Sequence, residues 1–262
     1  MELSEYVLKP LRRDEEFVLY RGTHSNHSGL PSILLLAPDS KLPAMETLKK
    51  MEHEYSLRDE LDSAWAVRPL ALSEQPGQMT LVLEDCGGET LDRLLPGPME
   101  LTQFLRFAVG IATALGGLHE KGLIHKNVKP PNVLVNPATG QARLMGFGIA
   151  SRLPRERQAP GPPEFIAGTL SYMAPEQTGR MNRSIDSRSD LYALGVTLYE
   201  MLTGTLPFTA SDPMELVHAH IARQPTPQHE RLKSVPAMNS GGSGAWRSRG
   251  RRDAIPKPMR RA

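Results

Sequence analysis

The hydrophobic pattern of the chain changes its period at residues 86–88, "CGG", and this change constrains the fold most. Before it, short runs such as "EFVLYRG" and "SILLLAP" are typical of strands, and one stretch at residues 44–59 has helical spacing. After it, helical patterns dominate, above all at residues 101–121 and Ser187–Thr203. We therefore expect an α+β arrangement of a strand-rich unit, a glycine-containing connector and a helix-rich unit, with a cleft at the connector.

The expected units have approximate limits that follow from this change of pattern. Residues 1–84 form the strand-rich unit, residues 85–236 form the helical unit, and residues 237–262 form a tail. The pattern predicts five strands, at residues 5–11, 16–22, 32–38, 65–72 and 79–85. It predicts a last helix at residues 214–223.

The formal net charge of +2 hides an asymmetry along the chain. Residues 238–262 carry seven Lys or Arg and one Asp, whereas the rest of the chain carries 24 basic and 28 acidic residues. This stretch has neither periodicity nor interleaved aromatic side chains, so we expect a disordered basic tail with no role in nucleic-acid binding.

The longest apolar run is "ILLLA" at residues 33–37, which is much shorter than the roughly 20 residues of a membrane-spanning helix. The first ten residues, "MELSEYVLKP", have no signal-peptide pattern, and Cys86 is the only cysteine, so it has no internal partner for a disulfide. These features predict a cytoplasmic protein without a membrane span.

Four motifs follow one another in a fixed order. The stretch "HKNVKPPNVL" keeps the spacing of the catalytic loop H-R-D-L-x-x-x-N at His125 and Asn132, and "GFG", residues 146–148, stands where D-F-G would be expected. The stretches "YMAPEQ" and "SDLYALGVTLYEMLTGTLPF" complete the series. By these motifs the chain resembles a Ser/Thr protein kinase over residues 18–223, which implies a bilobal kinase-like fold with a strand-rich N-lobe and a helical C-lobe.

A second resemblance concerns the stretch "APEQTGRMNRSIDSRSDLYALGVTLYEMLTG". It is similar to the N-terminal kinase-like module of large bacterial hybrid signalling proteins, in which an AAA-type ATPase, a sensor segment and a histidine kinase follow. This resemblance implies a role in signal transduction with signalling proteins as partners. It leaves the oligomeric state open.

The kinase resemblance also implies roles in the catalytic loop. Asn127 stands at the position of the catalytic base, and Lys129 and Asn132 are the other candidate catalytic residues. Asn132 is in addition the candidate metal ligand. In the third strand, Leu36 stands where a phosphate-binding lysine would be expected, and Glu54 is the helix glutamate that would pair with that lysine.

The remaining roles implied by the resemblance lie around the cleft and in the C-lobe. Residues Glu84 to Cys86 would form the adenine-contacting hinge, and Gly146 occupies the principal metal-ligand position. Asp190 would brace the catalytic loop, and Glu176 would form an internal ion pair with a later arginine.

Phosphoryl transfer requires held phosphates, a divalent metal and a group that orients and deprotonates the attacking hydroxyl. Residues 4–28 contain one glycine only, and no lysine occurs between Lys9 and Lys41. Gly146 offers no oxygen ligand to Mg²⁺, and the amide of Asn127 accepts a hydrogen bond but is no base near neutral pH. The resemblance implies ATP and Mg²⁺ as cofactors, and without the metal carboxylate we expect weakened binding of Mg²⁺. Loss of a base costs about 10²- to 10⁴-fold in rate, so we also expect inefficient catalysis.

Three functions are compatible with this sequence. The first is a catalytically impaired regulatory pseudokinase module. The second is an active Ser/Thr protein kinase that transfers the γ-phosphate of ATP with displaced residues, for example Asp85. The third is a non-functional truncated fragment, since a kinase C-lobe would need further helices after residue 223 and the sequence there is rich in Gly, Ser and Arg.

Overall fold

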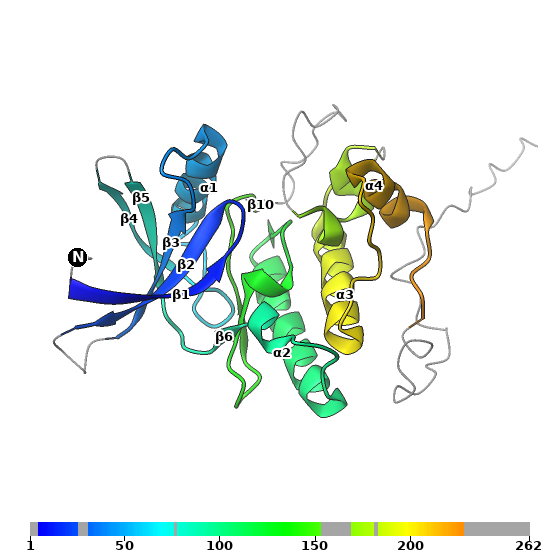
Figure 1. Cartoon of the computed structure of the whole chain (residues 1–262), viewed down its shortest axis with the longest axis horizontal. Coiled ribbons are helices and arrows are strands. Elements are labelled where there is room, and N and C mark those ends of the chain that lie inside the picture. The colour runs from blue at the N-terminus through cyan, green and yellow to red at the C-terminus, as the bar shows by residue number, and fades with distance from the viewer. Residues whose placement is uncertain (1–4, 26–30, 76–77, 153–168, 181–182, 228–262) are drawn as a thin grey trace, which may run out of the picture.

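A strand-rich half and a helical half lie side by side in the computed structural model of the chain (Figure 1). The structure describes residues 5–25, 31–75, 78–152, 169–180 and 183–227. This architecture confirms the predicted α+β, bilobal protein-kinase-like fold. The tail expected at residues 237–262 lies outside the described residues, as does the region after residue 227 in which further C-lobe helices were expected to be missing.

A five-stranded antiparallel sheet forms the N-terminal half, with the strand order β1-β2-β3-β5-β4. The strands are β1 (Tyr6–Arg13), β2 (Phe17–His24), β3 (Ile33–Pro38), β4 (Pro69–Gln75) and β5 (Gln78–Glu84). The central strand β3 is apolar along "ILLLA" and buries all five of these residues. A strand buried on both faces requires such a continuous apolar run, which explains why this segment lacks a polar alternation.

Helix α1 (Met45–Ser56) contacts β4 and β5 and is shorter at its C-terminal end than the predicted residues 44–59. The chain leaves the helix at Leu57, and Leu57 and Leu61 then pack into the hydrophobic core of the helical half. Tertiary packing of these two leucines therefore ends the helix before its apolar periodicity ends.

The segment at residues 65–72 was expected to be one strand, and this expectation is wrong for its first part. The backbone of Trp65 and Val67 pairs with Leu144 in the other half, through Leu144 N–H to Trp65 O and Val67 N–H to Leu144 O, both 2.9 Å. Strand β4 begins only at Pro69. The segment thus passes from one half to the other, a change of partner that an apolar run does not reveal.

The helical half is built on α2 (Leu101–Glu120), α3 (Ser187–Thr203) and α4 (Pro213–Ala222). These bounds agree within one residue with the predicted helices. The main core contains Phe107, Ile111 and Leu118 of α2, and Gly117 lets this helix approach Trp65, because a Cβ there would lie 2.5 Å from the indole ring.

Within the described residues, α2 is the one helix that is long and apolar enough to cross a membrane, with a mean hydropathy of 1.4 over a stretch that is 28% buried. A core helix of a soluble protein meets the same criterion. Helix α2 contributes residues to the main core and contacts α3 and β9. The expected lack of a membrane span stays a prediction.

Short elements carry the segments that were compared with kinase motifs. Strands β6, β8 and β9 form a three-stranded sheet, and β7 pairs with β10. Their bounds are β6 (Glu89–Thr90), β7 (Leu123–Ile124), β8 (Val133–Val135), β9 (Ala142–Leu144) and β10 (Ser151–Arg152). The 3-10 helices are η2 (Leu91–Leu94), η3 (Pro130–Asn132), η4 (Leu170–Tyr172) and η5 (Pro175–Thr178).

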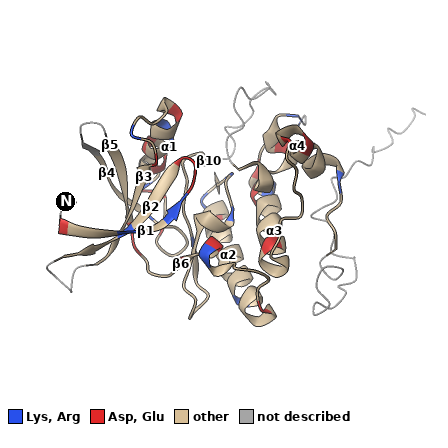
Figure 2. Cartoon of the chain, in the orientation of Figure 1, with Lys and Arg blue, Asp and Glu red and all other residues tan. Residues whose placement is uncertain are grey.

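Charged residues of both signs are interspersed along the two halves of the drawn chain (Figure 2). The loop between β7 and β8, which contains the catalytic-loop motif, is hydrogen-bonded both to Arg12 of β1 and to Asp190 of α3. The fold therefore brings the motif residues to the junction of the two halves.

Candidate functional site

The catalytic-loop segment is held by a buried carboxylate at the start of α3. Asp190 is fully buried and accepts hydrogen bonds from the backbone N–H groups of His125 at 2.8 Å and Lys126 at 2.7 Å. Its third contact is with Nε2 of His119 on α2, at 2.9 Å. These contacts hold Lys126 at a φ of 65°, a left-handed conformation that is costly for a residue with a side chain. Asp190 therefore has the bracing position that the resemblance implied.

His125 connects this loop to the "GFG" segment. Its Nδ1 accepts a hydrogen bond from the backbone N–H of Asn127 at 3.2 Å, so its Nε2 carries the hydrogen and donates to the carbonyl of Met145 at 3.1 Å. Burial lowers the pKa of His125, which favours the neutral ring that this pattern requires. The ring also packs against Phe147 with a centroid distance of 4.7 Å.

A cavity of about 500 Å³ lies at the junction of the two halves. Six residues proposed from the sequence line it: Leu36, Glu54, Asn127, Lys129, Asn132 and Gly146. The structure therefore brings together the residues that the resemblance assigned to the base, metal-ligand and phosphate-lysine positions. Glu84 and Cys86, the proposed hinge residues, do not line this cavity.

Leu36 occupies the lysine position on β3, where it pairs with Leu19 on one side and Leu81 on the other. It is 4% exposed and belongs to the core of the sheet. An apolar side chain at this place contributes packing and cannot bind a phosphate oxygen.

Glu54 is hydrogen-bonded to a backbone N–H group and not to a lysine. Its carboxyl is buried, with the residue 2% exposed, and Oε1 accepts a hydrogen bond from the backbone N–H of Gly146 at 3.2 Å. Burial raises the pKa of Glu54 from its usual value near 4.5 to about 7, against the opposing effects of backbone N–H groups and of Arg12. The contact keeps α1 attached to the "GFG" segment without an ion pair to β3.

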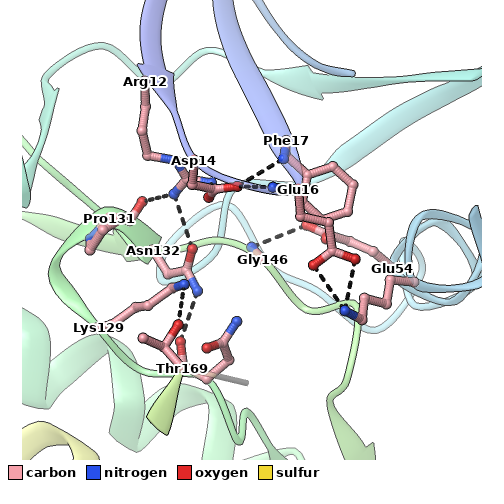
Figure 3. A network of polar contacts seen from close by, with 12 residues as sticks. Arg12, Asp14, Glu16, Phe17, Glu54, Lys129, Pro131, Asn132, Gly146 and Thr169 are labelled. Carbon is pink, nitrogen blue, oxygen red and sulfur yellow. Dashed lines mark hydrogen bonds and ion pairs between the residues drawn. The ribbon is translucent and has the colours of Figure 1, made fainter. Parts of the chain in front are cut away.

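Arg12, at the end of β1, reaches the catalytic loop (Figure 3). Its Nη1 donates to Oδ1 of Asn132 at 3.1 Å and to the carbonyl of Pro131, and its Nη2 lies 3.2 Å from Oδ2 of Asp14. Only 8% of the side chain is exposed. The amide oxygen proposed as a metal ligand therefore already accepts a hydrogen bond from a buried guanidinium.

The two other catalytic-loop candidates, Lys129 and Asn127, differ in the hydrogen bonds of their side chains. Lys129 donates from Nζ to the hydroxyl of Thr169 at 2.6 Å, and burial, together with the nearby charge of Arg12, lowers the pKa of its ammonium group. The side-chain amide of Asn127 makes no hydrogen bond to any residue that the structure describes, while its backbone carbonyl accepts one from Nδ2 of Asn132 at 2.8 Å. Asn127 can thus orient a hydroxyl group but cannot take its proton.

The donor set does not fit a bound Mg²⁺ ion. A magnesium site needs oxygen ligands at about 2.0 to 2.1 Å in octahedral geometry, with at least one carboxylate in most proteins. Gly146 supplies no ligand, Oδ1 of Asn132 is bound to Arg12, and the described residues contain no group of three His, Cys, Asp or Glu side chains able to hold a metal.

Four carboxylates line the cavity, and three of them have other partners. Asp14 accepts the backbone N–H groups of Glu16 and Phe17 at 3.0 and 2.8 Å, and Glu16 binds Nζ of Lys50 at 2.8 Å. Glu54 binds Gly146 as described. The fourth carboxylate, that of Glu15, belongs to an exposed residue of the turn between β1 and β2.

Asp85, which the sequence had offered as a displaced acid, is directed away from this cavity. Its carboxylate binds Nε of Arg21 at 2.7 Å and the hydroxyl of Ser32 at 2.7 Å, and 1% of the side chain is exposed. It does not line the cavity. The structure therefore gives no support to Asp85 as a substitute metal ligand.

The proposed hinge residues Glu84 and Cys86 lie outside the described cavity and have other contacts. The carboxylate of Glu84 accepts a hydrogen bond from the Ser63 hydroxyl at 2.6 Å, and burial raises the pKa of the half-buried Cys86 thiol. Cys86 packs against a hydrophobic cluster that joins Leu34 of the sheet to Leu134 of β8. The sheet and β8 are thus in direct hydrophobic contact near the proposed hinge.

The residues that close the cavity were not found from the sequence. Lys50 lies one helical turn before Glu54, so their common face on α1 was a usable signal. Arg12 and Glu16 belong to the charged stretch "LRRDEEF", which has no motif. Glu176 accepts a hydrogen bond from the hydroxyl of Ser189 at 2.7 Å, and its pairing with a later arginine stays a prediction.

The fold, the Asp190 brace and the ordered motifs together define a protein kinase domain. The family model for the protein kinase domain matches residues 33–243, and the chain belongs to this family. Its curated relatives include Ser/Thr protein kinases from several bacteria. It is 32% identical over 225 residues to Pkn2 of Myxococcus xanthus, which covers 84% of this chain and 27% of the relative.

Two further relatives are similar over a shorter stretch. PknB of Mycobacterium tuberculosis is 34% identical over 159 residues, which is 60% of this chain and 25% of the relative. A probable Ser/Thr protein kinase of Corynebacterium efficiens is 34% identical over 157 residues, which is 59% of this chain and 23% of the relative. The chain thus spans about a quarter of the length of the curated relatives it matches.

Proposed function

We propose that this protein is a Ser/Thr kinase-like regulatory module with impaired catalysis, a pseudokinase. The observation that carries the proposal is the composition of one cavity: Leu36, Asn127 and Gly146 occupy the lysine, base and metal positions. These three side chains cannot bind a phosphate, remove a proton or hold a metal. The scaffold contacts of Asp190 and His125 are nevertheless present, so the fold is kept where the chemistry is lost.

The module is proposed to act in bacterial signal transduction in the cytoplasm, through contacts with signalling proteins. The similarity of residues 174–204 to the kinase-like module of hybrid signalling proteins supports this context, as does the kinship with bacterial Ser/Thr kinases. A kinase fold that does not transfer phosphate efficiently can still regulate a partner protein through its conformation and its binding surface.

The test is a phosphotransfer assay with radiolabelled ATP, Mg²⁺ and a generic protein substrate. We expect no transfer from the wild-type chain above the level given by an Asn132→Ala variant. An ordinary kinase works at about 1 to 100 s⁻¹, so even strongly reduced transfer is measurable. Transfer at such a rate that disappears in Asn132→Ala would show an active enzyme and refute the proposal. Transfer of equal size in both proteins would indicate a contaminating kinase, to be removed by further purification before the comparison is repeated.

A further inference from the structure

The most unusual contact of the cleft joins a strand of the sheet to the catalytic loop. Arg12 and Asn132 are 120 residues apart in sequence, and the hydrogen bond between them joins the two halves. The guanidinium is compensated by Asp14 at 3.2 Å and lies almost fully out of solvent. A buried guanidinium needs several well-placed acceptors, and here it has a carboxylate, an amide oxygen and a backbone carbonyl.

Asn132 links the guanidinium of Arg12 to Gly146, the residue at the proposed metal-ligand position. Asn132 is held at both ends of its amide, by Arg12 at Oδ1 and by the carbonyl of Asn127 at Nδ2. A Cβ atom added at Gly146 would lie 3.0 Å from both Cγ and Oδ1 of Asn132. Arg12 thus holds Asn132 in the space beside Gly146 that a restored side chain would enter.

The turn that presents Arg12 is itself fixed. Glu16 accepts hydrogen bonds from Lys50 at 2.8 and 2.9 Å and from the hydroxyl of Thr47 at 2.9 Å, both on α1. Asp14 closes the turn through two backbone N–H groups. The turn between β1 and β2 is therefore attached to α1 on one side and to the catalytic loop on the other, as Figure 3 shows.

We propose that Arg12 is a built-in cation that takes the place of a divalent metal ion in this cleft and keeps the turn between β1 and β2 closed over it. The cleft is then excluded from metal uptake by a group of the protein itself. Arg12 lies outside residues 33–243, the stretch that matches the family model. The inference rests on the proposed function, since both concern the same impaired cleft.

The test restores the metal carboxylate with and without Arg12. Mn²⁺ prefers the same oxygen ligands as Mg²⁺, and its binding is followed by the loss of the spin-resonance signal of the hydrated ion. The proteins are wild type, Gly146→Asp, and the double variants Arg12→Met/Gly146→Asp and Arg13→Met/Gly146→Asp. Arg13 is a matched control, because it is the next residue, is 70% exposed and pairs with Asp39 outside the cavity.

We expect the wild-type chain to bind no Mn²⁺ and Gly146→Asp to bind it weakly. The Arg12→Met/Gly146→Asp variant should bind it about tenfold more tightly than Gly146→Asp, a size typical of coupling between neighbouring residues. The control with Arg13→Met should behave like Gly146→Asp. Uptake of Mn²⁺ by the wild type, or equal affinity of all three variants, would overturn the proposal.

A second measurement keeps the test independent of whether the double variant folds. Hydrogen exchange of Arg12→Met alone should become faster both in the turn at residues 14–16 and in the catalytic loop, since one side chain joins them. Arg13→Met should leave both unchanged. Unaltered hydrogen exchange in Arg12→Met would overturn the proposal that Arg12 keeps the turn between β1 and β2 closed over the cleft. A wild-type chain that takes up Mn²⁺ but transfers no phosphate would refute this inference and not the proposed function, whereas transfer of phosphate with Mg²⁺ would refute both.

Discussion

The buried carboxyl of Glu54 accepts a hydrogen bond from the backbone N–H of Gly146 at 3.2 Å, and this contact joins α1 to the "GFG" segment. A glutamate at this place was expected to pair with a lysine of β3, which here is Leu36. Burial raises the pKa of this carboxyl to about 7, against the opposing effects of backbone N–H groups and of Arg12.

The raised pKa of Glu54 predicts that stability falls as the pH rises. The folded chain holds this proton up to about pH 7, whereas in the unfolded chain the group ionises near 4.5, so the folded state binds more protons between these values. The free energy of unfolding should therefore decrease from about pH 4.5 to about pH 7 by about 3 kcal/mol, and the loss is complete above that range. Glu54→Gln, which stays neutral and can still accept the N–H of Gly146, should remove this decrease.

Chemical denaturation across this pH range measures the effect. Glu52→Gln is the matched control, since Glu52 lies on the same helix and is exposed. It should retain the pH profile of the wild type. A profile of Glu54→Gln that parallels the wild type would show that Glu54 does not carry the dependence.

A side chain at Gly146 should destabilise the fold more than one at Gly122. Both residues have positive φ, 80° and 70°, but a Cβ meets Asn132 at 3.0 Å in the first case and nothing within 4 Å in the second. Gly122→Ala should cost about 1 to 2 kcal/mol for the left-handed backbone alone. Gly146→Ala should cost about 1 kcal/mol more because the contact with Asn132 adds strain. Thermal and denaturant unfolding compare the two, and equal losses would contradict the crowding beside Asn132.

Replacement of Asp190 by asparagine should loosen the catalytic loop. Asp190 faces three donors, the N–H groups of His125 and Lys126 and Nε2 of His119, and an amide offers one acceptor oxygen in place of two. Asp190→Asn should cost about 2 to 4 kcal/mol of unfolding free energy. Asp59→Asn is the control, because 79% of its side chain is exposed and the substitution should change stability by less than about 0.5 kcal/mol. A loss no larger than that of the control would mean that the loop does not depend on Asp190.

Restoring the base alone should not restore catalysis. Asn127→Asp supplies a carboxylate next to the cavity, but Leu36 still binds no phosphate and Gly146 still binds no metal. Because these groups act together, transfer should stay below about one thousandth of the ordinary kinase rate. The radiolabel assay measures this, with the wild type and Asn132→Ala beside it. A rate close to that of an ordinary kinase would show that the base was the only missing part.

Local sequence patterns predicted most of the elements and part of the site. The apolar run of β3 reflects the burial of this strand on both faces. The helical spacing of α2 and α3 reflects the burial of one stripe of side chains on each helix. The fixed spacing from His125 to Asn132 and Gly146 predicted that these residues meet. Asn132 and Gly146 line one cavity, and the buried His125 is joined to Met145, the residue before Gly146, by a hydrogen bond. The segment at residues 65–72 was predicted as one strand, because an apolar run does not reveal which half each part pairs with.

By itself the sequence determined the kinase-like order of elements, and its resemblance to kinases predicted that Leu36, Asn127 and Gly146 stand at the lysine, base and metal positions. Only the tertiary structure decided what occupies the cleft: Glu54 bound to a backbone N–H and Arg12 bound to Asn132. The physical reason is that a hydrogen bond across 120 residues depends on how the sheet closes on the catalytic loop, and that closure is the sum of many packing contacts which no local pattern contains.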